Sequence, residues 1–194
     1  FIEMGFKYLQ NRKDRLHILE VGFGTGLNAL LSLAQARESQ QAINYIGIEP
    51  LPVPPELLEG LKYQEIFDSL EIRGFFATMH QSPWNQPIEI NEYFHLTKVK
   101  QPLMAYESPD SVDLVYFDAF APSKHPEMWD KEVFLHLAQM MEPGGILVTY
   151  CAKGQVKRDL QAAGFRVEKL PGPPGKREMI RAHYEGIIHP ENAS

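Results

Sequence analysis

A glycine-rich loop near the start of the chain limits the folds open to it more than any other segment. The loop, Gly22-Phe-Gly-Thr-Gly26, follows the strand-like apolar run Leu16–Val21 and precedes the helix-like run Gly26–Ala36. Glycines at such a turn let the backbone approach a ligand closely, and the N-terminus of the helix offers unpaired N–H groups. The loop therefore predicts a ligand site at a strand-to-helix turn, with a tight turn that binds nothing as the alternative.

Two common nucleotide-binding classes do not fit this loop. A dinucleotide fold requires G-x-G-x-x-G, and the position of the third glycine is Leu27 here. A P-loop requires Gly-Lys-Ser/Thr at the end of its motif, and that motif does not follow. The ligand of this loop is therefore expected to belong to a different class.

The next strand-like run, Asn44–Ile48, is followed directly by Glu49. A carboxylate at that position can accept hydrogen bonds from both hydroxyls of a ribose. Because ligands of α/β sheets lie beyond the carboxyl ends of the strands, we predict that Glu49 lies beside the glycine loop. An exposed loop acid is the alternative.

Short β-rich apolar runs alternate with helical patterns along the chain, which is typical of an α/β fold with a mostly parallel sheet. The last two runs are joined by the short connection Pro171–Gly175, so they can pair antiparallel. Seven strands are predicted, over residues 16–21, 44–48, 94–99, 112–117, 146–151, 165–170 and 179–184.

The helical patterns are less evenly defined than the strands. Gly144-Gly145 is predicted as a turn, and the stretch Ile66–Asn91 shows no clear period because Gly74, Pro83 and Pro87 interrupt it. Helices are predicted over Gly26–Ala36, from Glu56–Leu61, from an Asp130 N-cap through Met141, and over Gln155–Ala163.

Length and composition indicate one globular domain over residues 1–194. No apolar run approaches the ~20 residues of a membrane helix. A single cysteine, Cys151, excludes an internal disulfide framework and fits a reducing, cytoplasmic location. The histidines show no ligand spacing, so we expect no metal. The chain begins at Phe1 rather than Met, which leaves room for an upstream segment outside this sequence.

The net charge of −6 hides an uneven distribution. From Cys151 to Arg181 there are eight Lys or Arg residues and three acids, whereas the rest of the chain is acidic. Such a chain can present a basic face to phosphates, and a solvated surface helix and hairpin is the alternative. The candidate phosphate contacts are Lys124, Lys153, Lys157, Arg158, Lys176 and Arg177.

Asp118 directly follows the apolar run Val112–Phe117, so it is predicted at the carboxyl edge of the sheet. Partly buried carboxylates at such edges rarely lack a function, and a turn cap is the alternative. The nearby aromatic residues Phe120 and Trp129 could make an apolar wall or a stacking surface for a ligand, or could pack in the core. Asp118 is therefore the first candidate for a catalytic residue.

The Asp118 segment and the sequence after it resemble one family. The motifs that carry the resemblance are Asp118-Ala-Phe-Ala-Pro-Ser-Lys-His-Pro-Glu-Met-Trp129, Pro143-Gly-Gly-Ile-Leu-Val-Thr-Tyr150, Cys151-Ala-Lys-Gly154, Ala163-Gly-Phe165 and Pro171-Gly-Pro-Pro-Gly-Lys-Arg-Glu178. They resemble the methyltransferase domain that completes 5-methylaminomethyl-2-thiouridine at the wobble position of tRNA, and the resemblance covers about Phe1 to Arg181. The glycine loop after the acid Glu20 likewise resembles the first motif of class I methyltransferases.

The resemblance implies a class I methyltransferase (Rossmann-like) three-layer sandwich with a mostly parallel seven-stranded sheet and an antiparallel C-terminal strand. It also implies S-adenosylmethionine as the cofactor and tRNA as the partner. In well-known members this domain is fused to a flavin-dependent oxidase. The sequence shows no second glycine fingerprint, so we expect a stand-alone form that works with a separate oxidase or upstream modification enzymes.

The resemblance and the residue patterns together give a set of candidate site residues, with Asp118 as the catalytic one. The chain departs from class I enzymes after the third strand, where Thr97–Pro102 lacks an acid and leaves Glu107 or backbone groups to recognise adenine. The cofactor-binding candidates are Glu20, Gly22, Phe23, Gly24, Thr25, Gly26, Asn28, Glu49 and Asp118. The substrate-binding candidates are Phe120, Pro122, Lys124, Trp129, Lys153, Lys176 and Arg177.

The expected activity is N-methylation of the aminomethyl group of 5-aminomethyl-2-thiouridine in tRNA. Such a transfer needs in-line alignment and an unprotonated amine, and Asp118 is predicted to orient that amine. Three alternatives stay open: a small-molecule amine methyltransferase, an aminopropyltransferase of the spermidine synthase type, and a non-catalytic binding subunit. The intact Gly22, Gly24, Gly26, Glu49 and Asp118 argue against the last of these.

Overall fold

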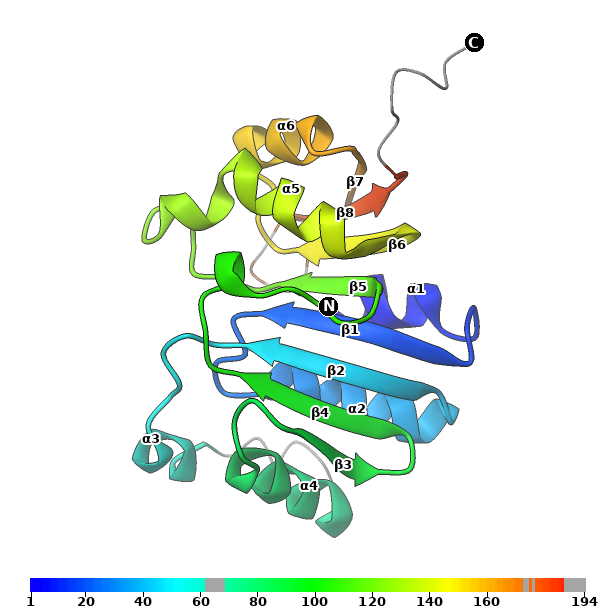
Figure 1. Cartoon of the computed structure of the whole chain (residues 1–194), viewed down its shortest axis with the longest axis vertical. Helices are drawn as coiled ribbons and strands as arrows, with labels where there is room; N and C mark the ends of the chain where they lie inside the picture. Colours follow the sequence, from blue (N-terminus) through cyan, green and yellow to red (C-terminus); the bar gives the residue numbers. More distant parts are fainter. Residues whose placement is uncertain (62–68, 173–174, 176, 187–194) are drawn as a thin grey trace.

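A computed structural model describes residues 1–61, 69–172, 175 and 177–186 of the chain. The described residues contain one sheet of eight strands in the order β3-β4-β2-β1-β5-β6-β8-β7 (Figure 1). Strands β4, β2, β1, β5 and β6 pair in parallel. The strands are β1 (Arg15–Val21), β2 (Ala42–Ile48), β3 (Pro87–Asn91), β4 (Phe94–Val99), β5 (Val112–Phe117), β6 (Met141–Thr149), β7 (Phe165–Pro171) and β8 (Glu178–Tyr184).

The two ends of the sheet are antiparallel. At one end β8 pairs antiparallel with β6 and with β7, which confirms the predicted closing pair. At the other end β3 pairs antiparallel with β4. This eighth strand was not among the seven predicted, because it lies in the stretch Ile66–Asn91 whose period is broken. Its alternating residues Ile88 and Ile90 pack against the core cluster that holds β4.

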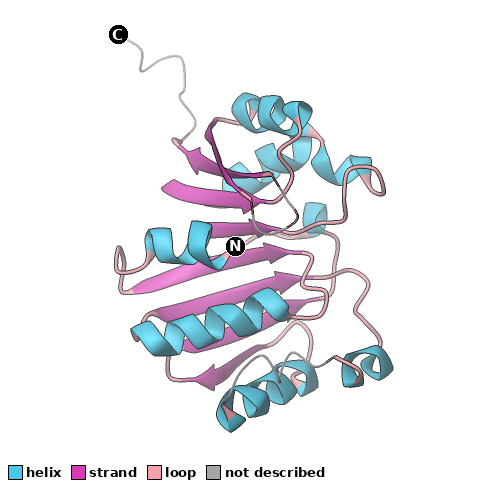
Figure 2. Ribbon diagram, turned by 180° about the vertical axis from the view of Figure 1, so that it is seen from behind, coloured by secondary structure: helices cyan, strands magenta, loops and turns pink. Residues whose placement is uncertain are grey.

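Helices cover both faces of the sheet, which makes the three-layer sandwich expected of the class. Figures 1 and 2 show α1 and α2 on one face and α5 and α6 on the other. Residues of α4 share a buried cluster with those of α2, so α4 belongs to the first face. The helices are α1 (Lys7–Leu9), α2 (Leu27–Ser39), α3 (Pro55–Glu59), α4 (Leu70–Gln81), α5 (Lys131–Met140) and α6 (Gly154–Ala162), with a π-helical turn at Ile2–Phe6 and 3₁₀ turns at Leu103–Ala105 and Pro126–Trp129. No helix in the described ranges is long and apolar enough to cross a bilayer.

Apolar side chains from both helical layers form two buried clusters, one on each face of the sheet. On the face of α2, Leu30 and Leu33 pack with Ile18 of β1. On the face of α5, Phe134 and Leu137 belong to the same cluster as Val115, Leu147 and other strand residues. Burial of these side chains removes apolar surface from water, and this burial is the main force that holds the layers together.

The region between α5 and β6 corrects one local prediction. Asp130 is the N-cap residue of α5, as predicted, although its side chain makes no capping hydrogen bond. The helix ends at Met140 and β6 begins at the next residue. The turn predicted at Gly144-Gly145 is therefore wrong: both glycines lie within β6, where the register against β5 is irregular and Gly144 has a φ of 89°. Glycine permits this left-handed backbone without strain.

The parallel strands bring their carboxyl ends to one edge of the sheet, on the left in Figure 1. The glycine loop follows β1, Glu49 follows β2, Asp118 follows β5 and Tyr150 follows β6. Since β2, β1, β5 and β6 are consecutive neighbours in the sheet, these four segments lie next to one another. The fold thus gathers the predicted glycine loop, Glu49 and Asp118 from positions up to about 100 residues apart in sequence, and Tyr150 joins them.

Candidate functional site

The glycine loop has a backbone conformation that residues other than glycine rarely adopt. Gly22, Gly24 and Gly26 have φ values of +88°, +50° and +73°, all in the left-handed region. A Cβ on Gly22 would lie 2.8 Å from the carbonyl oxygen of Asp118, so this position also lacks the space for a side chain. A Cβ on Gly24 would meet nothing nearer than 3.9 Å. The loop is therefore packed against the Asp118 segment at Gly22 and open at Gly24.

Phe23 points into the protein rather than toward the open side of the loop. Its ring is 3% exposed and lies against Gly47 of β2, where an added Cβ would come within 2.2 Å of it. The Phe23 N–H donates to the carbonyl oxygen of Ile48 over 3.0 Å. Phe23 was predicted as a cofactor contact, and the structure places both its ring and its N–H in contacts within the protein.

Glu49 lies against the glycine loop, where its position after β2 predicted it. One carboxylate oxygen accepts a hydrogen bond from the N–H of Gly24 at 3.1 Å, and the other accepts from the N–H of Leu51 at 3.0 Å. Each oxygen keeps a second lone pair. The carboxylate is thus oriented beside the open part of the loop and can still accept hydrogen bonds from a ligand.

Asn28 joins two carboxyl groups beneath the loop. Its side-chain nitrogen donates to Glu20 over 2.8 Å and to Asp118 over 2.9 Å. The hydroxyl of Tyr45 donates to the second oxygen of Glu20 over 2.8 Å. Asn28 was predicted as a cofactor contact, and in the structure its amide nitrogen holds Glu20, near the end of β1, and Asp118, which follows β5.

Glu20 is 1% exposed, and this burial raises the pKa of its carboxyl to about 8. The hydrogen bonds from Asn28 and Tyr45 act in the opposite direction, and the negative charge of Asp118 adds to the rise. In the ligand-free protein the neutral form of Glu20 is therefore favoured at pH 7. Asp118, which is only half-buried, is the more accessible of the two acids.

The backbone on either side of Asp118 is fixed by hydrogen bonds from three directions. The N–H of Asp118 donates to the carbonyl of Val21 at 3.0 Å. The Tyr150 hydroxyl donates to the carbonyl of Ala119 at 2.6 Å, and the Trp129 indole N–H donates to the carbonyl of Phe120 at 2.8 Å. These three hydrogen bonds fix the backbone from which the Asp118 carboxylate extends.

The two aromatic residues of this segment have different places. Trp129 is 4% exposed and packs edge-on to Phe117, with 4.9 Å between the ring centroids. Phe120 is 71% exposed, and its ring centroid lies 5.3 Å from that of His125. The structure therefore places Trp129 in the core, one of its two predicted roles, while Phe120 offers an open aromatic face near Asp118.

A cavity of about 470 Å³ lies between the segment after β5 and the start of α6. Three predicted substrate residues line it, namely Pro122, Trp129 and Lys153. Lys124 and Arg177 are exposed and are not part of its lining, and Lys176 lies outside the described residues. The other lining residues are Pro126, Asp130, Lys131, Glu132, Gln155, Val156 and Asp159. The volume is within the range of small-molecule sites.

Helix α4 contacts the glycine loop through His80, which Lys98 of β4 supports from behind, and the sequence patterns indicated neither residue. A His80 ring nitrogen lies 3.2 Å from the carbonyl oxygen of Thr25. Lys98 is 2% exposed, and its ammonium donates to the carbonyl oxygen of His80 at 3.1 Å and lies 5.0 Å from the Trp84 ring centroid. Burial lowers the pKa of Lys98 to about 8. The end of α4 is thus tied to both β4 and the loop.

Glu107, left open as an adenine contact, is exposed in the segment between the turn at Leu103–Ala105 and β5. That turn is held by His136 of α5, whose ring nitrogen lies 3.1 Å and 2.9 Å from the carbonyl oxygens of Leu103 and Tyr106. The structure gives Glu107 no contact with the glycine loop or Glu49 in the described residues. Adenine recognition by Glu107 stays a prediction.

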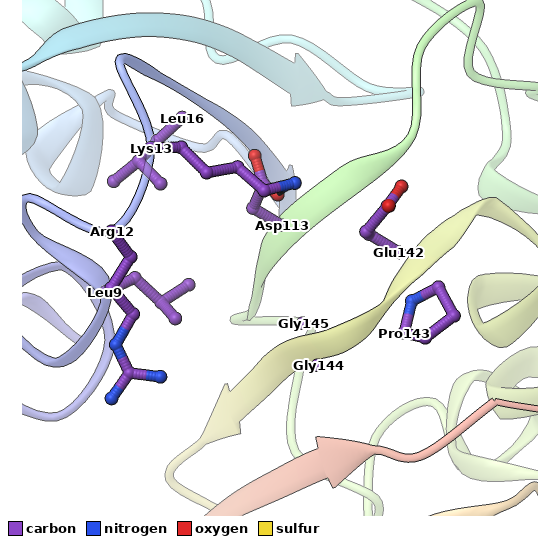
Figure 3. Close-up of a pocket in the computed structure, with 9 residues that line it drawn as sticks. All are labelled: Leu9, Arg12, Lys13, Leu16, Asp113, Glu142, Pro143, Gly144 and Gly145. Atoms are coloured by element: carbon purple, nitrogen blue, oxygen red, sulfur yellow. Dashed lines mark ion pairs between the residues drawn. The ribbon is translucent and has the colours of Figure 1, made fainter.

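A second, smaller cavity lies at the opposite edge of the sheet. It measures about 120 Å³, and Figure 3 shows Lys13 beside Asp113 within it, joined by an ion pair of 2.7 Å. Asp113 also accepts a hydrogen bond from the N–H of His17. These contacts hold the amino ends of β1 and β5 together. In the part of the chain with described coordinates, no group of three His, Cys, Asp or Glu side chains could hold a metal ion.

A glycine loop after β1, with acids after β2 and β5 at the same sheet edge, defines a Rossmann-like class I methyltransferase fold. A family model described as S-adenosyl-L-methionine-dependent methyltransferase matches residues 63–185, and the chain belongs to this family. The protein is therefore a methyltransferase that uses S-adenosylmethionine.

Two curated relatives carry the name tRNA 5-methylaminomethyl-2-thiouridine biosynthesis bifunctional protein MnmC. The one from Leptospira interrogans is 35% identical over 182 residues, covering 90% of this chain and 28% of the relative. The one from Campylobacter hominis is 31% identical over 184 residues, covering 90% of this chain and 26% of the relative. The chain thus spans between a quarter and a third of the length of these proteins.

Two solved structures share the fold. MNMC2 from Aquifex aeolicus superimposes with a TM-score of 0.73 at 22% identity, covering 97% of this chain and 60% of that one. CalS10, an amino pentose methyltransferase from Micromonospora echinaspora solved with its cofactor bound, gives a TM-score of 0.54 at 11% identity, covering 93% and 88% of the two chains.

The glycine loop fits S-adenosylmethionine in three respects. The backbone at Gly24 is open, because an added Cβ there would meet no atom nearer than 3.9 Å. Glu49 presents an oriented carboxylate beside that opening. Gly26 begins α2, whose first N–H groups lie next to the loop. A ligand with hydroxyl and carboxylate groups, such as this cofactor, matches these acceptors and donors.

Proposed function

We propose that this protein methylates the primary amine of an aminomethyl group on the modified wobble uridine of tRNA, converting 5-aminomethyl-2-thiouridine to 5-methylaminomethyl-2-thiouridine. The names of the curated relatives support the tRNA substrate. The observation that carries the proposal is Asp118, a half-buried carboxylate held rigidly beside the cofactor loop. A tRNA substrate also implies a cytoplasmic location.

In this proposal the loop Gly22–Gly26 and Glu49 hold the cofactor. When bound, the cofactor supplies an electrophilic methyl group that needs no acid to activate it. The protein therefore has two remaining tasks, which are to align the acceptor nitrogen and to keep its lone pair available. Alignment alone can contribute roughly 7–11 kcal/mol to lowering the barrier.

Asp118 performs the second task. An alkyl amine has a pKa near that of lysine, about 10.4, so it arrives mostly as the ammonium. The carboxylate attracts this ammonium, whose proton is lost to solvent, and Asp118 then accepts a hydrogen bond from the neutral amine so that its lone pair faces the methyl group. As the nitrogen gains its fourth bond it becomes cationic, and the charge of Asp118 stabilises it.

The substrate side of the site is proposed to use the cavity of about 470 Å³ after β5 and the open ring of Phe120. Bases that leave the stack in single-stranded RNA are commonly bound on aromatic rings. Lys153 at the rim of the cavity, with Lys157 and Arg158 on the following turn of α6, is proposed to contact phosphates.

The direct test is transfer of a labelled methyl group from S-adenosylmethionine to tRNA that carries 5-aminomethyl-2-thiouridine. Asp118→Asn keeps the size of the side chain and an acceptor for Asn28, and it should lower turnover by about 100-fold or more. Asp110→Asn, an exposed acid before β5, is the matched control and should be neutral. Near-normal turnover of Asp118→Asn would exclude the proposed role, and equal labelling of tRNA that lacks the aminomethyl group would exclude the proposed substrate.

A further inference from the structure

Two ring donors from different elements hold consecutive carbonyl groups just after Asp118. The Tyr150 hydroxyl, one residue after β6, donates to Ala119 at 2.6 Å, and the Trp129 indole donates to Phe120 at 2.8 Å. The two rings also contact each other edge-on, with centroids 6.2 Å apart. We call Tyr150 and Trp129 the carbonyl clamp.

The segment needs such a clamp because neither sheet nor helix fixes it. Strand β5 ends at Phe117, and the next hydrogen-bonded turn begins only at Ala121, whose carbonyl accepts from Lys124. The N–H of Asp118 still bonds to Val21, but the peptide groups after it are beyond the ladder between β1 and β5. The direction of the Asp118 side chain depends on the peptide groups on both sides of it, and the clamp fixes the later ones.

The clamp and the amide of Asn28 act on the same residue from opposite sides. Asn28 of α2 bonds to the Asp118 carboxylate at 2.9 Å, whereas Tyr150 and Trp129 bond to the backbone that follows. Gly22 also lies so close that an added Cβ would come within 2.8 Å of the Asp118 carbonyl oxygen. The distance between Asp118 and the cofactor loop is therefore fixed by contacts from three elements.

We propose that Tyr150 and Trp129 are positioning residues that hold Asp118 at its working distance from the glycine loop. The inference rests on the proposed role of Asp118. An error of about 1 Å in the position of a reacting group can cost about 100-fold in rate, so loss of one clamp bond should reduce turnover. It should not weaken cofactor binding, because the clamp hydrogen bonds go to the carbonyl groups of Ala119 and Phe120 and not to the glycine loop or Glu49.

The test uses Tyr150→Phe, which removes one hydroxyl and keeps the ring. We expect kcat to fall about tenfold, with the affinity for S-adenosylhomocysteine unchanged within about twofold by calorimetry. Amide hydrogen exchange at residues 119–121 should become faster. Tyr184→Phe, a buried tyrosine of β8 that packs on Phe165, is the matched control and should change none of these quantities.

A double-mutant cycle shows whether Tyr150 acts through Asp118. Under single-turnover conditions, Tyr150→Phe should have less than a twofold effect in the Asp118→Asn background. A tenfold effect there, or wild-type kcat in the single variant, would overturn the proposal.

If Asp118→Asn itself is active, the proposed function fails, and hydrogen exchange in Tyr150→Phe alone decides on the clamp. Trp129→Phe should reproduce the faster exchange, which keeps the test valid if Tyr150→Phe does not fold; unchanged exchange would contradict it.

Discussion

Glu20 combines deep burial with hydrogen bonds from two neutral donors. Both oxygens of its carboxyl are occupied, one by Asn28 and one by Tyr45, yet burial still raises the pKa to about 8. The unfolded chain releases this proton near pH 4.5. Between these two values the folded protein holds more protons than the unfolded chain, so the free energy of unfolding falls as the pH rises.

Glu20→Gln should remove this pH dependence. The amide is neutral at every pH, and the Tyr45 hydroxyl can accept from it instead of donating to it. For the ligand-free protein, the wild-type free energy of unfolding should fall between pH 5 and pH 8 by on the order of 1–3 kcal/mol more than that of the variant. Urea denaturation at the two pH values measures the difference. Glu92→Gln changes an exposed turn residue and should keep the wild-type change of the free energy of unfolding with pH. If Glu20→Gln kept that change as well, the Glu20 carboxyl would titrate normally.

The contact between Gly47 and Phe23 connects strand β2 to the glycine loop. Gly47 lies in the interior of β2, where glycine normally weakens a strand. It is required here because any Cβ would come within 2.2 Å of the Phe23 ring. The ring cannot move freely, since His80 and Trp84 lie beside it with centroids 6.4 Å and 6.2 Å away.

Gly47→Ala should therefore displace Phe23 and, with it, the glycine loop. Overpacking of this kind costs about 1–3 kcal/mol of stability, and affinity for S-adenosylhomocysteine should fall as well. Adding Phe23→Leu to Gly47→Ala should restore part of the lost stability and part of the lost affinity. Gly74→Ala in α4 is the control, because nothing lies within 4 Å of its added Cβ and alanine favours a helix. Thermal unfolding measures the change in stability, and calorimetry measures the change in affinity for S-adenosylhomocysteine. Unchanged binding by Gly47→Ala would mean that the loop does not depend on this contact.

Comparison of elements shows what the sequence could predict. The seven predicted strands each contain a continuous apolar or alternating run, and each is present. Strand β3 and helix α4 were not predicted, because Gly74 and two prolines break the pattern, although Ile72, Phe76 and Met79 of α4 are buried on one face. Tertiary packing decided the structure of this region, and local preference did not.

Some parts of the candidate site could likewise be predicted from the sequence, and others could not. The glycine loop, Glu49 and Asp118 were predicted at one edge because each directly follows a parallel strand, and the fold brings them together there. The contacts of Tyr45, Tyr150 and Lys98 could not be predicted, because their partners lie in other elements at large sequence separations. Gly47 gave a usable signal, since a glycine inside a strand often marks a close approach by another group.

On the scale of the whole molecule, charge is distributed unevenly. The chain has a net charge of −6, yet its C-terminal segment from Cys151 to Arg181 is basic. In this segment Lys153 and Arg158 are exposed on or beside α6, and Lys153 lines the cavity after β5. Lys153 and Arg158 therefore form a basic surface beside the proposed substrate site, whose lining also includes Asp130, Glu132 and Asp159.

If this surface binds tRNA phosphates, the affinity should depend strongly on salt. Between about 50 and about 200 mM salt, the binding constant for tRNA should fall about tenfold or more, and Lys153→Gln should reduce the log–log slope by about 1. Lys7→Gln, an exposed lysine of α1, should leave the slope unchanged. Filter binding across a salt series provides the measurement. A flat wild-type response would show that phosphates do not contribute to binding.

The place of β8 has a consequence for how the chain folds as it is synthesised. Strand β8 lies between β6 and β7, so β7 reaches the sheet only through a strand that follows it in sequence. Residues 165–171 therefore leave the ribosome before their partner strand, whereas β2, β4 and β5 each emerge after a strand with which they pair. The half of the sheet with the glycine loop can assemble early in translation, and the β6–β8–β7 end can close only after Tyr184 has left the ribosomal tunnel.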